Sequence, residues 1–312
     1  MQILDRHFAA ACFPPRDPFS HKGDYGHALL CAGSFGMMGA AVLAARACLR
    51  GGIGKLTVYV PGAGYSILQT AVPEAMVRTD SDERILTAVP DLTPYDAIAV
   101  GPGIGTAPAT AGFLQALLGQ ARQADKPVVI DADALNLLAA EPALLDRLPG
   151  RTILTPHAGE FRRMVAGYAR QQTDALQADT SPERMTLPEM HALQMHLAGK
   201  WQAVIVLKGH ETHIAADGTC YINPTGNAGM ATGGSGDVLT GLTLALAART
   251  AKMRASGWHG DCSETALAAC SACYVHGRAG DLAAEQYGET ALTAGDIVAK
   301  IGAAILEIET IK

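Results

Sequence analysis

The sequence predicts an α/β protein whose central sheet is mostly parallel. Short runs of Val, Ile and Leu alternate with Ala-rich segments of helical length, which is the pattern of repeated strand–helix units. Most of these runs are apolar at every position, as strands buried on both faces should be. Glycine clusters follow several of them, at the place where an open parallel sheet binds its ligands. No break in composition indicates a second domain, so we expect one domain over residues 1–312.

The strands are expected in the short β-branched and aliphatic runs. In chain order these are Ala28–Cys31, Lys55–Val60, Ala97–Val100, Val128–Ile130, Thr152–Leu154 and Val204–Leu207. A hairpin should follow, from Thr212–Ala215 to Thr219–Ile222, because the Asp217-Gly218 pair between them favours a tight turn.

The helices are expected in the longer Ala- and Leu-rich segments between these strands. They are Met38–Arg50, Ala107–Ala124, Ala134–Ala139, Gly159–Ala166, Leu187–Lys200, Gly236–Ala248, Thr265–Arg278 and Gly295–Glu309. Two polar segments without a clear period, Tyr168–Pro188 and Lys252–Cys262, are expected to be surface loops.

Charge and composition argue against several classes of protein. The 24 Lys and Arg residues against 30 Asp and Glu give a net charge of −6, which provides no attraction to nucleic acid or to an anionic membrane. The weakly polar stretch Val238–Ala248 is far shorter than the roughly 20 apolar residues of a membrane span. The first twenty residues lack the order of a secretory signal, so we expect a cytoplasmic protein.

The cysteines indicate reduced thiols. There are seven, an odd number spread over a long chain, unlike a secreted disulfide scaffold. Cys270 and Cys273 form a CxxC motif within a helical segment, with no second pair to complete a zinc site, and we expect them to pack in the core.

The segment NAGMATGGSGDVLTG, from Asn227 to Gly241, carries the strongest chemical signal. Small residues lead into a helix expected to begin near Ser235 or Gly236, so backbone amides and the helix dipole should form an anion hole at Gly234, Ser235 and Gly236. Asp237 then lies in the first turn. It either stabilises the helix as a simple N-terminal charge or acts as a general base beside the bound phosphate, and we favour the base.

Several motifs in a fixed order resemble one known family. They are HKGDYGHALLCAGSFGMMGAAVLAARACLRGGIG from His21 to Gly54, AVGPGIG from Ala99, VVIDADALNLL from Val128, LTPHAGEF from Leu154, VLKGHET from Val206, and the segment from Asn227 described above. Together they resemble the NAD(P)H-hydrate dehydratases of the ribokinase-like superfamily over about residues 20–310. The first glycine cluster, GSFGMMG, departs from a dinucleotide fingerprint, which argues against an NAD-dependent dehydrogenase.

This resemblance implies a ribokinase-like sheet flanked by helices on both faces and assigns site residues. The residues implied to contact the hydrated nicotinamide nucleotide are Ala40, Gly103, His157 and Asp237. Those implied to bind the adenine nucleotide are Lys208, Gly209, His210, Glu211, Thr212 and Gly236. Those placed near the phosphates or magnesium are Asn136, Glu160 and Asn227, with no direct metal ligand assigned.

The same resemblance implies a reaction and its partners. The S epimer of hydrated NADH or NADPH would be dehydrated at the expense of ADP, or of ATP, with Mg²⁺ to screen the phosphates. A homotetramer and a separate epimerase are also implied. The alternatives are a ribokinase-like kinase of a vitamin precursor, which would share GSGD and Mg²⁺, and a non-catalytic adenine-nucleotide-binding regulator, which would not need Asp237.

Four site residues also have structural interpretations. His157 could cap the helix that follows it, and Lys208 could be a solvated strand end. Asp131 and Asp133 could be a metal pair, but Asp133 also suits the N-cap before Ala134, which we favour.

A zinc site at His210 and His213 is disfavoured by the residue spacing. The sequence there is HETH and not HExxH, and residues three apart on a strand point to opposite faces.

Overall fold

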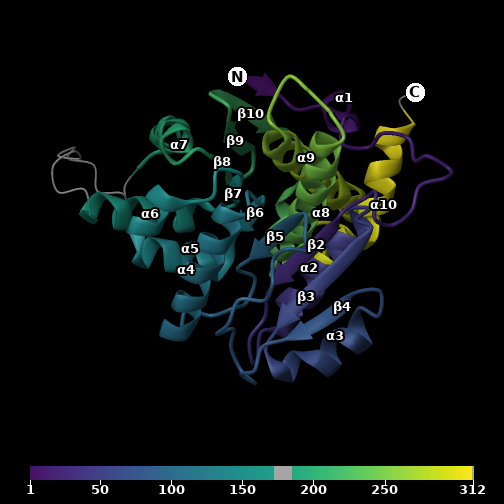
Figure 1. Cartoon of the computed structure of the whole chain (residues 1–312). Coiled ribbons are helices and arrows are strands. Elements are labelled where there is room, and N and C mark those ends of the chain that lie inside the picture. Colours follow the sequence, from purple (N-terminus) through teal and green to yellow (C-terminus); the bar gives the residue numbers. More distant parts are fainter. Residues whose placement is uncertain (172–184, 311–312) are drawn as a thin grey trace.

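The computed structural model describes residues 1–171 and 185–310, and they form one sheet with helices on both faces (Figure 1). The ten strands lie in the order β1-β10-β9-β8-β7-β6-β5-β2-β3-β4. Their bounds are Gln2–Ile3 (β1), His27–Cys31 (β2), Lys55–Val60 (β3), Met76–Thr79 (β4), Ala97–Val100 (β5), Val128–Ile130 (β6), Thr152–Leu154 (β7), Ala203–Leu207 (β8), Thr212–Ala216 (β9) and Thr219–Asn223 (β10). The β8–β9 and β9–β10 pairs are antiparallel and the other pairs are parallel, as predicted.

The helices divide between the two faces of this sheet. Their bounds are Arg6–Ala10 (α1), Met38–Arg50 (α2), Tyr65–Ala71 (α3), Pro108–Gln123 (α4), Ala132–Ala140 (α5), Ala158–Gln171 (α6), Leu187–Trp201 (α7), Ser235–Ala255 (α8), Glu264–Tyr287 (α9) and Ala294–Glu309 (α10). One core cluster holds the buried side chains of α2, α8, α9 and α10, and the other holds those of α4 to α7. Figure 1 shows these two groups of helices on opposite sides of the strands.

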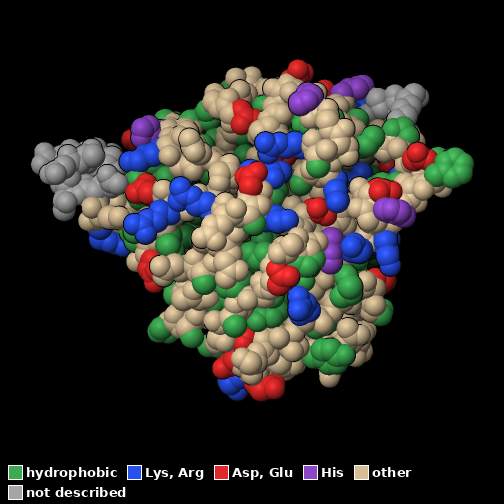
Figure 2. Space-filling view, viewed as in Figure 1, with side chains coloured by type: hydrophobic (Ala, Val, Ile, Leu, Met, Phe, Trp, Pro, Cys, Tyr) green, Lys and Arg blue, Asp and Glu red, His purple; other side chains and the backbone are tan. Residues whose placement is uncertain are grey.

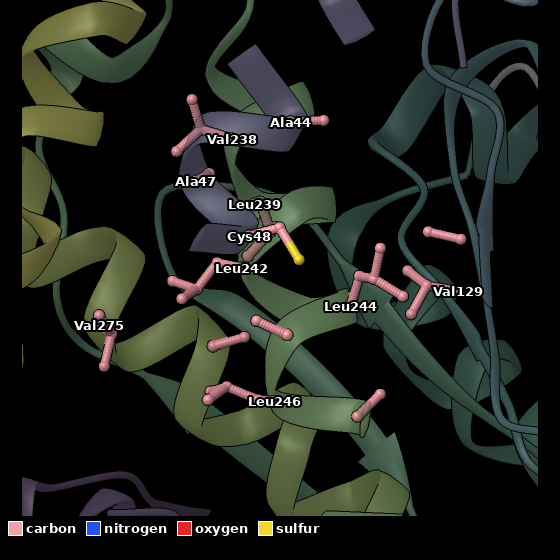
Figure 3. Close-up of a cluster of buried hydrophobic side chains, with 14 of the residues drawn as sticks. Ala44, Ala47, Cys48, Val129, Val238, Leu239, Leu242, Leu244, Leu246 and Val275 are labelled. Atoms are coloured by element: carbon pink, nitrogen blue, oxygen red, sulfur yellow. The ribbon is translucent and has the colours of Figure 1, made fainter. Parts of the chain in front are cut away.

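The packing of α8 on α2 explains part of the GSGDVLTG motif. A Cβ atom at Gly241 would lie 1.9 Å from the Ala44 carbonyl oxygen, so only glycine permits this contact between the helices. Val238 and Leu242 of α8 are fully buried beside Ala44, Ala47 and Cys48 of α2 (Figure 3). The close contact fixes the start of α8 relative to the sheet, and with it the position of the predicted anion hole.

The elements that the sequence did not predict are short and peripheral. Strands β1 and β4 close the two edges of the sheet, and most of their residues are exposed, so they lack the apolar runs that identified the other strands. Helices α1 and α3 span five and seven residues, too few to show a helical period.

The two predicted surface loops are partly wrong. Helix α6 continues to Gln171, with Tyr168 buried against Trp201 at a ring-centroid distance of 5.4 Å, while residues 172–184 of that segment lie outside the described part of the chain. Leu187 and Pro188 already belong to the first turn of α7. Helix α8 likewise runs through Lys252 to Ala255 before the second loop begins.

Surface charge and cysteines agree with the expectations from composition. Basic and acidic side chains are interspersed on the face shown in Figure 2, without a basic patch. Within the described residues, no helix is both long enough and apolar enough to cross a membrane. The seven cysteines are free thiols, and Cys270 and Cys273 are buried in α9 as predicted.

The strand order reverses its direction at β2, at the carboxyl edge of the sheet. From β2 the chain proceeds outward through β3 and β4, then returns to β5 on the other side of β2. The loops after β2 and β5 therefore leave in opposite directions, which is where open α/β sheets bind ligands. The segments after β6, β7 and β8 extend the same edge.

Candidate active site

The predicted anion hole lies at the start of α8. Gly234 occupies the N-cap position with φ +91°, a left-handed conformation that favours glycine, and α8 begins at Ser235 as predicted. A Cβ at Gly234 would also lie 2.5 Å from the Leu43 side chain. This terminus has no side-chain cap, but the Ser235 amide donates a 3.4 Å hydrogen bond to the Thr232 carbonyl, so the amides that follow it in the first turn are better placed to bind a phosphate.

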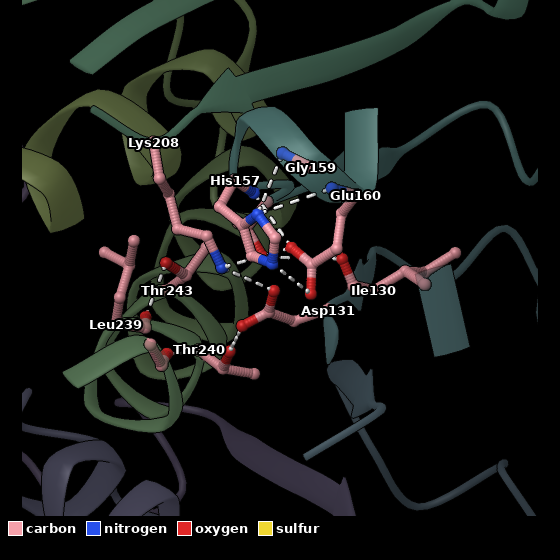
Figure 4. Close-up of polar contacts among 11 residues, drawn as sticks. Ile130, Asp131, His157, Gly159, Glu160, Lys208, Leu239, Thr240 and Thr243 are labelled. Atoms are coloured by element: carbon pink, nitrogen blue, oxygen red, sulfur yellow. Dashed lines mark hydrogen bonds and ion pairs between the residues drawn. The ribbon is translucent and has the colours of Figure 1, made fainter. Parts of the chain in front are cut away.

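Lys208 faces this helix terminus and is held by carboxylates (Figure 4). Its Nζ lies 2.8 Å from Asp131 Oδ1 and 3.8 Å from Glu160 Oε2. The Lys208 side chain is 20% exposed, so it is not a solvated strand end and that interpretation was wrong. Burial opposes its charge, but Asp131 and Glu160 outweigh burial and raise the pKa of Lys208, which keeps it a cation.

Asp131 connects Lys208 to α8. Its carboxylate is 1% exposed, and its Oδ2 accepts a 2.6 Å hydrogen bond from the Thr240 hydroxyl. Position 131 precedes α5 as the N-cap residue, so the predicted N-cap at Asp133 was wrong. Asp133 lies within the first turn, where its Oδ2 accepts a 2.9 Å hydrogen bond from the Gly105 amide. The side chain of Asp133 thereby fixes the glycine loop that follows β5.

Asp237 is the carboxylate best suited to accept a proton. Burial raises its pKa, the charges of Asp131 and Asp133 raise it further, and Lys208 partly offsets them, which gives a value of about 6. A base with a pKa near the working pH can both take up and release a proton efficiently. Its position one residue after Gly236 places it beside the phosphate that the helix terminus would hold.

His157 caps α6, as its structural interpretation predicted. Its Nδ1 accepts hydrogen bonds from the amides of Gly159 at 3.0 Å and Glu160 at 3.3 Å, while Glu160 Oε2 accepts the His157 amide hydrogen at 2.8 Å. Burial and the Lys208 charge lower the pKa of His157, although Glu160 opposes them. The cap leaves half of the ring exposed toward the site, so it does not exclude a contact with substrate.

A cavity of about 880 Å³ opens between β8, the segment 223–236 and α9. Its walls include four residues of the predicted nucleotide-binding stretch, Lys208, Gly209, His210 and Thr212. They also include Ser235 and Gly236 of the predicted anion hole. His157 also lines it, whereas Glu211 is exposed and lies outside it. The volume and the mixture of apolar and polar walls suit a nucleotide.

The predicted substrate residues fall into two groups. Gly103 and Ala40 adjoin one another, since a Cβ at Gly103 would lie 3.2 Å from the Ala40 Cβ. Gly103 has φ +64°, and its carbonyl accepts a 2.7 Å hydrogen bond from Ser34 of the loop after β2. His157 lies with the nucleotide residues instead. The Asp133–Gly105 hydrogen bond ties the loop that holds Gly103 to the start of α5.

The three residues expected near phosphate or magnesium differ in how far their polar atoms are already bonded to protein. The carbonyl oxygen of Asn136 accepts from Arg163 at 3.0 Å, and both ends of the Asn227 amide are hydrogen-bonded to protein. Glu160 keeps a carboxylate next to Lys208. Among the described residues, no group of three or more His, Cys, Asp or Glu side chains is arranged to hold a metal. The Asp131 carboxylate is bonded to Lys208, and the Asp133 carboxylate is bonded to the Gly105 amide.

Sequence analysis missed Thr240 and His276. Thr240 stands inside the GSGDVLTG motif, four residues after Gly236, and this helical spacing was the available signal. His276 lines the cavity from α9, with its Nε2 3.4 Å from the Ser235 hydroxyl. Burial lowers the pKa of His276 to about 4, so it is neutral. A single histidine in an Ala-rich helix gives no signal of this role.

Comparisons with solved structures agree with this architecture. A ribokinase-like superfamily protein from Enterococcus faecalis V583 superimposes with a TM-score of 0.78 at 25% identity, covering 98% of this chain and 96% of that one. An ADP/ATP-dependent NAD(P)H-hydrate dehydratase from Bacillus subtilis, co-crystallised with ATP/Mg²⁺, gives a TM-score of 0.75 at 30% identity over 98% of both chains. The predicted ribokinase-like fold is confirmed.

The sequence comparisons identify a family. Residues 28–302 match the family described as NAD(P)H-hydrate dehydratase. The chain is 38% identical to the ADP-dependent (S)-NAD(P)H-hydrate dehydratase of Bacillus subtilis, over 81% of this chain and 86% of that protein. It is 37% identical to a bifunctional NAD(P)H-hydrate repair enzyme of Moorella thermoacetica over 95% of this chain, and spans about half the length of that relative, 52%. The chain therefore belongs to the NAD(P)H-hydrate dehydratase family.

Proposed function

We propose that this protein dehydrates the S form of hydrated NADH or NADPH, using ADP as co-substrate and releasing AMP and phosphate. The observation that carries the proposal is the position of Asp237, a carboxylate whose pKa is raised to about 6, at the phosphate-binding terminus of α8 and within the field of Lys208. A protein that only bound nucleotide would gain nothing from a buried base at this point, because its charge repels phosphate.

The residues support a two-stage reaction. The carboxylate of Asp237 takes the proton from the hydroxyl group on the hydrated ring, and that oxygen attacks the terminal phosphorus of ADP while the bond to AMP breaks. The lone pair of the ring nitrogen then expels phosphate, and loss of a proton from the neighbouring carbon restores the double bond. The oxygen and hydrogens of the added water leave in the phosphate and in the released protons, so the reaction balances.

Two groups would stabilise the transferred phosphoryl group. The amides at Ser235 and Gly236 are oriented before substrate arrives, and Lys208 adds a positive charge that Asp131 and Glu160 hold in position. Mg²⁺ would be held here mainly by nucleotide phosphates and water, because the Glu160 carboxylate is buried and already accepts the His157 amide hydrogen, and the ion would neutralise phosphate charge when bound.

The test is to incubate hydrated NADH with the protein, Mg²⁺ and either ADP or ATP, and to follow both nucleotides by HPLC. We expect NADH and AMP to appear in equal amounts when ADP is supplied. A vitamin-precursor kinase or a nucleotide-binding regulator would leave the hydrate unchanged, and that result would reject the proposal.

We further propose that ADP is the better nucleotide, as the name of the Bacillus subtilis relative supports. The ratio of kcat/KM for ADP and ATP measures this preference. A clear preference for ATP would show that the relative's specificity does not extend to this chain.

The setting of the reaction completes the proposal. We propose a cytoplasmic homotetramer that works with an epimerase, because only one epimer of the hydrate is the substrate. The bifunctional names of relatives such as the Moorella protein support a linked second activity. Sedimentation analysis of the purified protein tests the tetramer.

A further inference from the structure

The segment 223–230 forms one wall of the nucleotide cavity, and α9 supports it from behind. Thr225, Gly226, Asn227 and Met230 line the cavity, whereas Asp281 of α9 does not. Asp281 Oδ1 accepts a 3.0 Å hydrogen bond from Asn227 Nδ2, and its Oδ2 accepts a 3.1 Å hydrogen bond from the Gly226 amide. One carboxylate therefore holds two consecutive residues of the wall.

Asn227 also holds the short helical turn that follows it. Its side-chain oxygen accepts a 3.1 Å hydrogen bond from the Gly229 amide and caps the short helical turn Ala228–Met230. Both ends of the Asn227 side-chain amide are thus bonded to protein: Nδ2 donates to Asp281, and Oδ1 accepts from Gly229. Its contacts are those of a brace between α9 and the wall.

The spacing of small residues on α9 supports the same conclusion independently. Gly277, Gly280 and Asp281 are three and four residues apart and share one face of the helix. A Cβ at Gly277 would lie 2.2 Å from Thr225 Oγ1, and a Cβ at Gly280 would lie 2.2 Å from Met230 Sδ. The wall can pack this closely on α9 only because both positions are glycine.

We infer that Asp281 is a positioning residue for the nucleotide site, which it shapes through Asn227 and Gly226, and that Asn227 does not ligate phosphate or magnesium. The inference rests on the proposed nucleotide binding in this cavity. It assigns the shape of the cavity wall to a hydrogen-bonded pair outside the reacting atoms. Loss of the pair should weaken nucleotide binding, while the hydrate-binding residues Ala40 and Gly103 remain undisturbed.

A charge exchange between the two residues separates positioning from direct ligation. Asn227→Asp places two carboxylates face to face, and Asp281→Asn removes an acceptor. We expect each change to raise the Kd for MgADP about tenfold or more, the effect of losing about one hydrogen bond to a charged group. The double variant Asn227→Asp/Asp281→Asn restores every donor and acceptor in exchanged places, so its Kd should return to within about threefold of the parent.

Isothermal calorimetry with MgADP, together with the Tm of each variant, tests the inference. If the parent binds no MgADP, the proposed function fails and the inference fails with it. If the parent binds and Asn227→Asp alone binds as tightly or more tightly, residue 227 acts as a direct ligand of the metal and the inference is wrong. A folded double variant that remains as weak as the single variants would overturn it as well.

A steric pair provides a second test that does not change charge. Gly277→Ala should raise the Kd for MgADP because its methyl group displaces Thr225. Gly302→Ala in α10 is the matched control, since a Cβ there has no heavy atom within 4 Å. Equal Kd values for the two variants would show that the contact between α9 and the wall does not shape the site.

Discussion

The two edges of the sheet both contain a cavity and buried ion pairs, but their charges are balanced differently. At the amino edge, a cavity of about 650 Å³ lies beside Glu264, whose carboxylate pairs with Arg151 at 2.6 Å and with Arg254 at 2.9 Å. Burial opposes ionisation there, but hydrogen bonding and these two cations outweigh it and lower the pKa of Glu264. Its negative charge is fully compensated by the protein.

At the carboxyl edge, Lys208 is close to Asp131 and Glu160 and feels the charge of Asp237 as well. One cation therefore serves three carboxylates, and the pKa of Asp237 rises to about 6 as a result of burial and its acidic neighbours. A carboxylate whose charge is neutralised by protein cations stabilises the fold. A group of carboxylates with too few cations is instead suited to bind a ligand or a proton. Cavity size alone does not separate these two cases.

The largest expected effect is that of Asp237→Asn. The change keeps the shape of the side chain and the amides of the anion hole, but removes the base, and turnover should fall by about 10²–10⁴. ADP binding should persist or tighten, because a negative charge leaves the phosphate site. The general-base role is falsified by a folded variant that binds ADP and turns over within about threefold of the parent.

The next effect compares Lys208→Met with Arg151→Met, one cation from each edge. Breaking a buried ion pair lowers the free energy of unfolding by about 3–5 kcal/mol, and by less where the side chains are partly exposed. The Lys208 side chain is 20% exposed and that of Arg151 is 15% exposed. Both variants should therefore lower Tm. Calorimetric titration should show that Lys208→Met loses ADP affinity more than hydrate affinity, while Arg151→Met retains both. Loss of ADP binding in both variants would contradict the comparison.

The pH dependence sharpens the same contrast. Because Asp237 must be ionised to act as a base, kcat/KM should fall about tenfold per pH unit below a pKa of about 6. In Asp131→Asn the fall in kcat/KM should begin at a lower pH, because loss of the Asp131 charge lowers the pKa of Asp237. An unchanged limb would mean that another group controls the rate.

The same titration should affect stability in the opposite direction. The folded state binds the Asp237 proton more tightly than the unfolded chain does, with its pKa raised from 3.8 to about 6. The contribution of Asp237 to the free energy of unfolding therefore declines as pH rises through this window. In Asp237→Asn, urea unfolding should show that this decline is reduced.

The smallest effect concerns His157. Loss of its cap in His157→Ala should cost about 1 kcal/mol of stability, whereas His157→Asn can still cap α6. Because His157 lines the cavity together with the predicted nucleotide residues, loss of the ring should weaken ADP binding in both variants. If the Asn variant matches the parent in affinity for ADP and for the hydrate, the ring acts only as a cap.

Two kinds of feature could be predicted from the sequence: the alternating buried strands and helices, and the glycine-rich start of α8. The buried strands were found within one residue because both faces of each are covered, which makes the whole run apolar. The start of α8 followed from the run of small residues before Asp237. The edge strands could not be found in this way, because β1 and β4 are short and mostly exposed and so carry no continuous apolar run.

The polar contacts of the site were less predictable. The sequence suggested no role for Asp131 beyond a disfavoured metal pair with Asp133, because its partners, Lys208 and Thr240, lie 77 and 109 residues away in the chain. Pairings over such separations are set by strand order, and no local pattern encodes them. The same holds for Asp281, which meets Asn227 across 54 residues.

The two edge strands have a consequence for self-association. A long sheet of apolar strands offers a template to which another chain can add if its edge is open. Here β1 pairs two residues with β10 at one side, and the exposed β4, with Arg78, ends the other. The short β1 thus covers two of the five residues of β10, which would otherwise form the edge of the sheet. We expect removal of this least conspicuous strand to open β10 to the addition of a strand from another chain.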